Sequence, residues 1–212
     1  MSDSAAVMCW RCGTPLLPAA GAPFVLDCHA CGALQPPAPV TAFQLLGLPV
    51  GYEINLDDLD RRYHELSRRV HPDRFAAADS REKRFSLEWS TRLNDAYATL
   101  RDPLRRAEYL LAMHGVESQD ESRTIMNPAF LDEQMDFRER LAELRHEPDP
   151  LPSLARLRRD LKSAVEERNE GLRVALHGPG LANPASAAIL VQELKFFNKL
   201  LQEVDRLEEQ FD

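Results

Sequence analysis

Apolar residues recur every three or four positions along most of the chain beyond residue 40. The run NLDDLDRRYHELSRRV places one apolar stripe on a helix, formed by Leu56, Leu59, Tyr63, Leu66 and Val70. Asn55 is the expected N-cap, and the acidic residues that follow it favour the positive end of the helix dipole. The pattern therefore predicts a helix over residues 55–70.

A second long helix is predicted after a short break at residues 71–78. Asp79 followed by Glu82 resembles an N-terminal cap, and Pro103 marks the expected end. The apolar stripe of this helix consists of Phe85, Trp89, Leu93, Ala96 or Tyr97, and Leu100. Together with a short helix around 41–46, these segments predict an antiparallel helical hairpin whose tip is the loop HPDR.

The C-terminal region predicts three more helices, at roughly 128–147, 151–176 and 185–210, separated by EPDPLP and HGPGLANP. Their expected core positions include Phe130, Phe137, Leu141 and Leu144 on the first and Leu190, Leu194, Phe197, Leu201 and Val204 on the last. Leu131, Met135 and Phe196 lie about 100° or more away from these faces. A single stray apolar residue is ordinary on a helix, but three together favour a binding patch.

All four cysteines lie within the first 31 residues, in the motifs C-W-R-C-G and C-H-A-C-G. Each C-x-x-C pair can present two thiolates to one metal, and the glycine after each pair permits a tight turn. Four thiolates complete a tetrahedral shell without an open position for catalysis, which predicts structural zinc at Cys9, Cys12, Cys28 and Cys31. Two disulfides, or redox-active pairs, are the alternatives, and a reducing compartment disfavours both.

The charge of the chain is uneven. Residues 41–115 contain twelve Lys/Arg and twelve Asp/Glu, whereas residues 116–212 contain thirteen and twenty, and the net charge is −8. An acidic chain gains no counterion-release drive toward DNA or RNA, so we expect no nucleic-acid partner. The four-cysteine segment agrees, because a zinc-ribbon nucleic-acid binder needs basic knuckles and residues 1–40 contain a single basic residue, Arg11.

No targeting or membrane segment is expected. The start, MSDSAAVM, has the pattern of neither a secretory signal nor a transit peptide, and breakers interrupt the long uncharged run at 174–192. We therefore expect a protein without a membrane partner, cytoplasmic if bacterial. The mitochondrial matrix is the alternative if a transit peptide has been removed.

The loop at His71, Pro72 and Asp73 admits three interpretations. Proline forces the preceding residue out of the helix and fixes its own φ, and Asp73 can brace the turn, so the residues by themselves favour a rigid polar turn. A catalytic His–Asp pair is disfavoured because no nucleophile motif accompanies it. The third interpretation is a surface for another protein, beside a helix face rich in arginine.

Two further runs identify a resemblance. YHELSRRVHPDRF followed by LNDAYATLRDP resembles the J domain of DnaJ-type co-chaperones, and LRRAEYLLAMHG narrows the resemblance to the HscB family of iron–sulfur cluster assembly. Arg74 departs from the lysine that is common in J domains, but it keeps the charge. The resemblance implies that the loop contacts the ATPase of a DnaK/HscA-type chaperone and that Arg62, Arg68 and Arg69 meet an acidic patch there. Without the family argument, these arginines are equally an ordinary solvated helix face.

The resemblance also implies a second partner, the scaffold protein IscU. The positions that carry over are Leu131, Met135, Asp136, Glu139 and Phe196, while Asp132 stands where an apolar residue is common. The chain has no phosphate-binding G-x-x-x-x-G-K-[ST] motif, so we expect a co-chaperone without enzymatic activity. A general DnaJ-like adaptor for unfolded proteins is the alternative, although the Gly/Phe-rich segment expected there is missing.

These expectations combine into a mainly α chain of four parts. They are a zinc-binding four-cysteine module at 1–34, a Pro-rich linker at 35–40, a J domain at 41–115 and a C-terminal three-helix bundle at 116–212 that binds the scaffold. Because the Pro-rich segment reads as a stiff extended spacer, we expect it to couple the module weakly to the helices. The module on its own has too little core to fold without metal.

Overall fold

The computed structural model describes residues 7–16, 23–116, 128–144, 147–178 and 181–211. The chain forms two compact units, one of Met1–Val50 with Ile54–Asp102 and the other of Gly51–Glu53 with Pro103–Asp212. The described residues are mainly helical, as predicted, and contain no strand longer than an isolated bridge. None of the described helices is both long enough and apolar enough to span a membrane.

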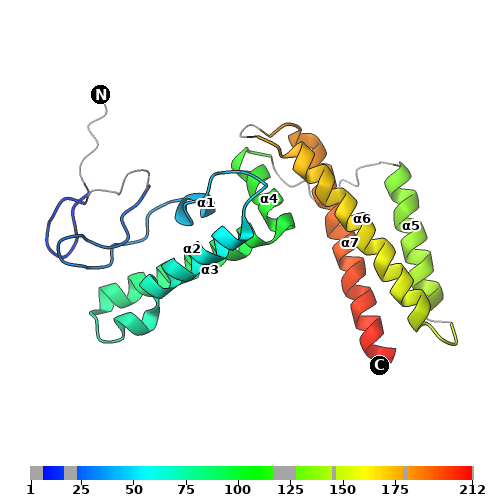
Figure 1. Cartoon of the computed structure of the whole chain (residues 1–212), viewed down its shortest axis with the longest axis horizontal. Helices are drawn as coiled ribbons and strands as arrows, with labels where there is room; N and C mark the ends of the chain where they lie inside the picture. The colour runs from blue at the N-terminus through cyan, green and yellow to red at the C-terminus, as the bar shows by residue number, and fades with distance from the viewer. Residues whose placement is uncertain (1–6, 17–22, 117–127, 145–146, 179–180, 212) are drawn as a thin grey trace. The chain divides into compact units, whose positions relative to one another are not determined.

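The first unit contains the helical hairpin (Figure 1). Its elements are α1 (Ala42–Leu45), α2 (Leu56–Val70), the 3-10 turn η1 (Pro72–Phe75) and α3 (Ser80–Arg101). The predicted caps are present: the Asn55 side chain accepts from the Asp58 N–H at 2.9 Å, and Asp79 accepts from the N–H groups of Arg81 and Glu82. Local sequence therefore sets where both long helices begin.

The apolar stripes of α2 and α3 face one another, with one exception. Leu59, Val70, Trp89 and Leu100 are at most 2% exposed, so they form the buried seam of the hairpin. Leu56, which the periodicity placed on the stripe, is 49% exposed. It is the first residue of α2, and the seam begins one turn further along the helix.

Two similar knuckles form the four-cysteine module. The N–H of Gly13 donates to Cys9 O at 2.9 Å, and the N–H of Gly32 donates to Cys28 O at 2.8 Å. Both glycines have φ near +70°, a conformation that side chains other than glycine rarely adopt. An isolated antiparallel bridge closes each knuckle, Met8 with Pro15 and Asp27 with Leu34.

The module packs against α3, which corrects the expectation of weak coupling. The Trp10 ring meets the Phe85 ring edge-on at 6.1 Å between centroids, and the Phe24 ring lies 5.2 Å from that of Trp89. The Trp89 indole N–H also donates to Gln35 O at 2.9 Å. The composition of the Pro-rich segment indicated that it is stiff. It did not indicate that aromatic residues before and after this segment pack against one another.

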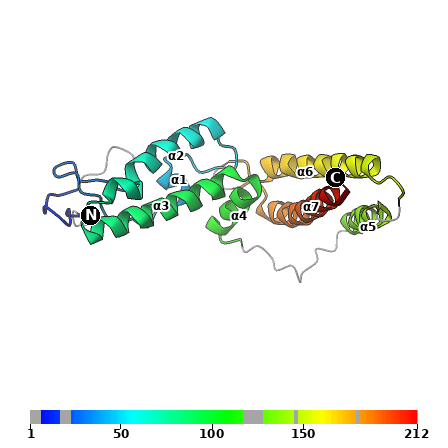
Figure 2. The ribbon, with the colours of Figure 1, turned by 90° about the horizontal axis from the view of Figure 1, so that it is seen from below.

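The second unit consists of α4 (Pro103–Met113), α5 (Pro128–Glu143), α6 (Leu151–Ala175) and α7 (Pro184–Phe211), shown in Figures 1 and 2. The last three match the predicted segments closely, and their shared core contains Phe137, Leu141, Leu144, Leu154, Leu157, Leu161, Ala164, Phe197, Leu200, Val204 and Leu207. Because α4 packs against α7, with Lys195 Nζ 2.7 Å from Glu108 Oε1, the compact unit starts earlier than the predicted boundary after residue 115.

Candidate functional site

The four cysteine sulfurs converge on one point. All four Sγ atoms lie within 4.8 Å of one another, and the Cys9–Cys31 and Cys12–Cys28 separations are both 3.7 Å. A tetrahedral ion with sulfur ligands at about 2.3 Å requires sulfur–sulfur edges of about 3.8 Å. The cysteine cluster therefore fits a metal of this coordination, and its four cysteines are not joined in disulfides.

The surroundings of the cluster suit thiolates that are held by a cation. Burial opposes ionisation of Cys9, but N–H groups of the turn, including that of Arg11, lower its pKa to about 6. An N–H of Ala33 favours the Cys31 thiolate, yet loss of solvent and the neighbouring thiols raise the pKa of Cys31 to about 12. All four cysteines can therefore be thiolates together at neutral pH only when a cation binds them.

One residue links this cluster to the helices. The Gln35 side-chain amide donates to Cys9 Sγ at 3.4 Å, while its backbone carbonyl accepts from the Trp89 indole. Gln35 is 2% exposed, so both bonds are shielded from water. Gln35 thus links Cys9 Sγ to the Trp89 side chain in the core of the hairpin.

The His-Pro-Asp loop lies at the tip of the hairpin, as predicted. His71 ends α2, and its Nδ1 accepts from the Asp73 N–H at 3.3 Å, which braces the turn. The side chains of His71 and Asp73 are 53% and 91% exposed. Behind them the buried Ser86 hydroxyl donates to Val70 O at 2.6 Å and anchors the loop to α3. The loop is therefore held by its base while its polar groups face solvent.

The three arginines of the predicted chaperone contact differ in whether their guanidinium groups are bound within the protein or exposed. Arg62 Nε lies 2.8 Å from Asp58 Oδ2, and its Nη1 donates to Gly47 O at 2.9 Å, so this guanidinium joins α2 to the turn after α1. Glycine is favoured at residue 47 because its φ of +63° is one that other residues rarely adopt, and a Cβ there would also displace Arg62 Nη1, which would lie 2.7 Å from it. Arg68 and Arg69 are exposed near the loop, and Arg69 forms an ion pair with Asp27.

The predicted scaffold-binding residues occupy α5 and α7. Met135 is 69% exposed, and Asp136 and Glu139 are exposed beside it. Leu131 is half-buried. Phe196 is also half-buried, because it packs against the bundle core and meets the Phe197 ring edge-on at 5.5 Å between centroids. Phe196 is therefore partly a core residue, whereas Met135 is an exposed apolar side chain.

Sequence reasoning missed Arg138, which lies over the Phe196 ring at 5.4 Å from its centroid. Arg138 stands seven residues after Leu131, two helical turns along the same side of α5. The side of α5 that carries Leu131 therefore borders α7 near Phe196. This spacing was readable in advance, but the neighbouring helix that it meets was not.

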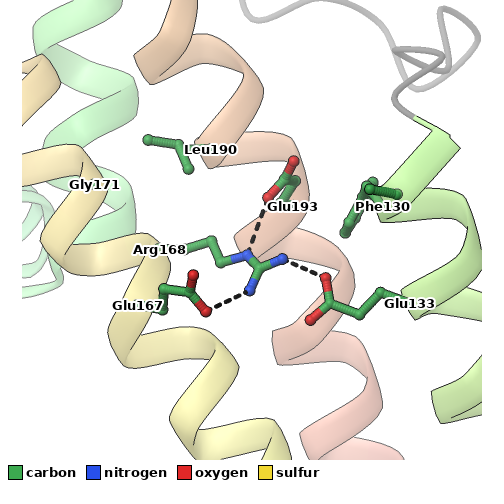
Figure 3. Close-up of a pocket in the computed structure, with 8 residues that line it drawn as sticks. Phe130, Glu133, Glu167, Arg168, Gly171, Leu190 and Glu193 are labelled. Atoms are coloured by element: carbon green, nitrogen blue, oxygen red, sulfur yellow. Dashed lines mark hydrogen bonds and ion pairs between the residues drawn. The ribbon is translucent and has the colours of Figure 1, made fainter.

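A cavity of about 430 Å³ lies where α5, α6 and α7 meet (Figure 3). Arg168 projects from α6 and places its Nε 3.0 Å from Glu193 Oε2 on α7, while its Nη2 pairs with Glu133 on α5. The guanidinium also lies 4.8 Å from the centroid of the Phe197 ring. Because its donors are committed to carboxylates from two neighbouring helices, Arg168 holds α5 to the bundle.

Known proteins match this chain along most of its length. The family model of the DnaJ domain matches residues 41–109, and that of the HSCB C-terminal oligomerisation domain matches residues 126–205. The co-chaperone protein HscB homolog of Shewanella amazonensis is 38% identical over 167 residues, which are 79% of this chain and 96% of the relative.

Two solved structures resemble the fold. The chaperone HscB from Vibrio cholerae is 36% identical, with a TM-score of 0.71, over 81% of this chain and 99% of that one. The human co-chaperone protein HscB is 30% identical, with a TM-score of 0.85, over 95% of this chain and 98% of that one. The part of this chain that the human structure leaves uncovered is shorter than the four-cysteine module at 1–34. The human match therefore extends into that module. The chain belongs to the HscB family of co-chaperones, J-domain proteins that are not enzymes.

Proposed function

We propose that this protein is the co-chaperone that delivers an IscU-type scaffold to a DnaK/HscA-type chaperone and stimulates ATP hydrolysis by that chaperone. The observation that carries the proposal is the His-Pro-Asp loop, which exposes His71 and Asp73 while Ser86 holds its base. Polar side chains fixed in this way lose little conformational entropy when they bind, so they suit an interface. Membership of the HscB family supports the same role.

The arginine contribution to this contact comes from Arg68 and Arg69. Both are exposed beside the loop, so an acidic patch on the chaperone can reach them and steer the encounter. Arg62 contributes less, because its guanidinium is already bound to Asp58 and to the carbonyl oxygen of Gly47.

The scaffold binds the second unit, on the side of α5 that carries Met135. This side chain is the exposed apolar anchor of the patch, and Asp136 and Glu139 form its polar rim. Leu131 and Phe196 extend the patch toward the bundle core, where Phe196 also packs. An apolar anchor with a charged rim provides both affinity and orientation.

The metal of the module is Zn²⁺, held by Cys9, Cys12, Cys28 and Cys31. Sulfur separations of 3.7 Å fit the tetrahedral shell that four thiolates form around this ion. A closed sulfur shell leaves no position for substrate, so zinc supplies folding energy to the two knuckles.

A stimulation assay tests the function. The ATPase rate of a DnaK/HscA-type chaperone is measured with wild-type protein and with His71→Gln, each with and without an IscU-type scaffold. We expect stimulation by the wild type, further stimulation with the scaffold, and loss of both in the variant at unchanged helix content. Normal stimulation by His71→Gln contradicts the role of the loop, and synergy with unfolded proteins in place of the scaffold favours a general DnaJ-like co-chaperone.

A further inference from the structure

The second cysteine knuckle lies beside the base of the His-Pro-Asp loop. Asp27, which directly precedes the first cysteine of that knuckle, forms an ion pair with Arg69 near the C-terminal end of α2. Next to this pair is a cavity of about 230 Å³ with walls from both parts of the chain. The module contributes Leu26, Asp27, Gly32 and Leu34, and the J domain contributes Arg69, Arg74 and Phe75.

Buried contacts determine the position of Asp27. It forms a bridge with Leu34, which is 2% exposed. The Leu34 N–H donates to Glu82 Oε1 on α3 at 3.1 Å, and Glu82 is 5% exposed. The backbone at Asp27 is therefore held on the hairpin through a shielded hydrogen bond of its bridge partner, and Asp27 does not belong to a freely moving segment.

The ion pair itself is open to water and to a partner. The side chains of Asp27 and Arg69 are 48% and 43% exposed, and an ion pair with this exposure contributes little stability. A carboxylate of another protein can therefore displace Asp27 without a large penalty. Until that happens, Asp27 neutralises one of the two exposed arginines of the loop surface.

We propose that the four-cysteine module forms part of the chaperone-facing surface, and that Asp27 competes with an acidic surface of the chaperone for Arg69. This inference rests on the proposed function, because it takes the chaperone as the partner of the loop. It gives the module a role in binding in addition to its fold. The negative charge of Asp27 lowers the affinity for an acidic partner, and its removal raises that affinity.

The test is a double-mutant cycle in the full chain, with the affinity for a DnaK/HscA-type chaperone measured by calorimetry. Asp27→Asn is expected to tighten binding by about two- to five-fold, the range that an exposed ion pair supports. In the Arg69→Ala background the same change is expected to have no effect, because the guanidinium for which Asp27 competes is absent. Asp27→Ser repeats the test if asparagine disturbs the knuckle.

The matched control is Asp57→Asn, which alters the net charge equally. Asp57 lies in the first turn of α2, about 18 Å along the helix from Arg69, beyond the screening length of about 8 Å in physiological salt. It is therefore expected to leave the affinity unchanged. Equal tightening by Asp27→Asn and Asp57→Asn, or tightening that persists without Arg69, overturns the inference. Failure of the wild type to bind overturns the proposed function together with it.

Discussion

Arg11 Nη2 lies 2.7 Å from Glu82 Oε2, and this ion pair joins the four-cysteine module to α3. Glu82 is 5% exposed, and its other carboxylate oxygen accepts from the Leu34 N–H at 3.1 Å. A carboxylate withdrawn from water in this way needs all of its partners, because an unpaired buried charge is costly. Glu82 therefore forms a polar contact between the module and the hairpin, and the loss of this contact is expected to destabilise both.

We expect Glu82→Ala to reduce the free energy of unfolding by about 1–3 kcal/mol, because it leaves Arg11 and the Leu34 N–H without their acceptor. Urea unfolding followed by circular dichroism at 222 nm measures the change. Glu88→Ala, on the same helix, is the control: Glu88 is partly exposed and pairs with Arg92 four residues later, so its loss is worth at most about 0.5 kcal/mol. Similar losses in both variants argue against a shared contact.

Loss of the metal site is expected to weaken the hairpin as well as the module. Cys28→Ser removes one sulfur of the cluster, and the unfolded knuckle can no longer hold Gln35 between Cys9 and Trp89. We expect a lower melting temperature of the helical signal and altered Trp89 fluorescence, with the same effects when a chelator is added to the wild type. An unchanged helical melt would show that the Pro-rich segment isolates the module.

The two arginines Arg62 and Arg68 are expected to give opposite phenotypes. Arg62→Ala breaks the bonds to Asp58 and to Gly47 O, so it lowers the melting temperature. Arg68→Ala leaves stability unchanged, because the side chain is exposed, and weakens stimulation of the chaperone ATPase. Thermal melts and ATPase assays on both variants check this, and a reversed assignment of the two phenotypes would refute it.

Met135 and Phe196 are expected to separate scaffold binding from stability. Met135→Ala removes a side chain that is 69% exposed, so we expect about 1–3 kcal/mol of lost IscU affinity at an unchanged melting temperature. Phe196→Ala also lowers the melting temperature, because this ring packs against Phe130 and Phe197. Calorimetry and thermal melts on each variant distinguish the two effects. Full affinity in Met135→Ala places the scaffold site elsewhere.

The N-cap of α3 is expected to make the first unit sensitive to acid. The Glu82 N–H, followed by Arg11, lowers the pKa of Asp79, so the folded state binds the proton of this group less readily than the unfolded state does. The contribution of Asp79 is therefore fully present above the ordinary aspartate pKa of about 4 and is lost as the pH falls through the lower folded value. Asp79→Asn is expected to reduce the dependence of the melting temperature on pH between about pH 5 and pH 2. An unchanged slope contradicts this account.

The sequence alone determined the features that depend on neighbouring residues. The caps at Asn55 and Asp79, the turn at Pro72 and the glycine after each cysteine pair act within a few residues, so their local chemistry is sufficient. Periodicity placed the three bundle helices nearly at their observed bounds. Paired cysteine spacing also identified the cluster, because each knuckle brings two sulfurs together before the chain folds any further.

Only the tertiary structure decided which distant residues these side chains contact. Glu82 has the position of a capping residue, yet it points to Leu34, 48 residues earlier, and Arg11, 71 residues earlier. Arg62 turned out to be bound to the turn after α1, and Phe196 to belong partly to the core. The periodicity of one helix shows which face is apolar but not which element that face meets, and contacts between distant segments are set by packing of the whole unit.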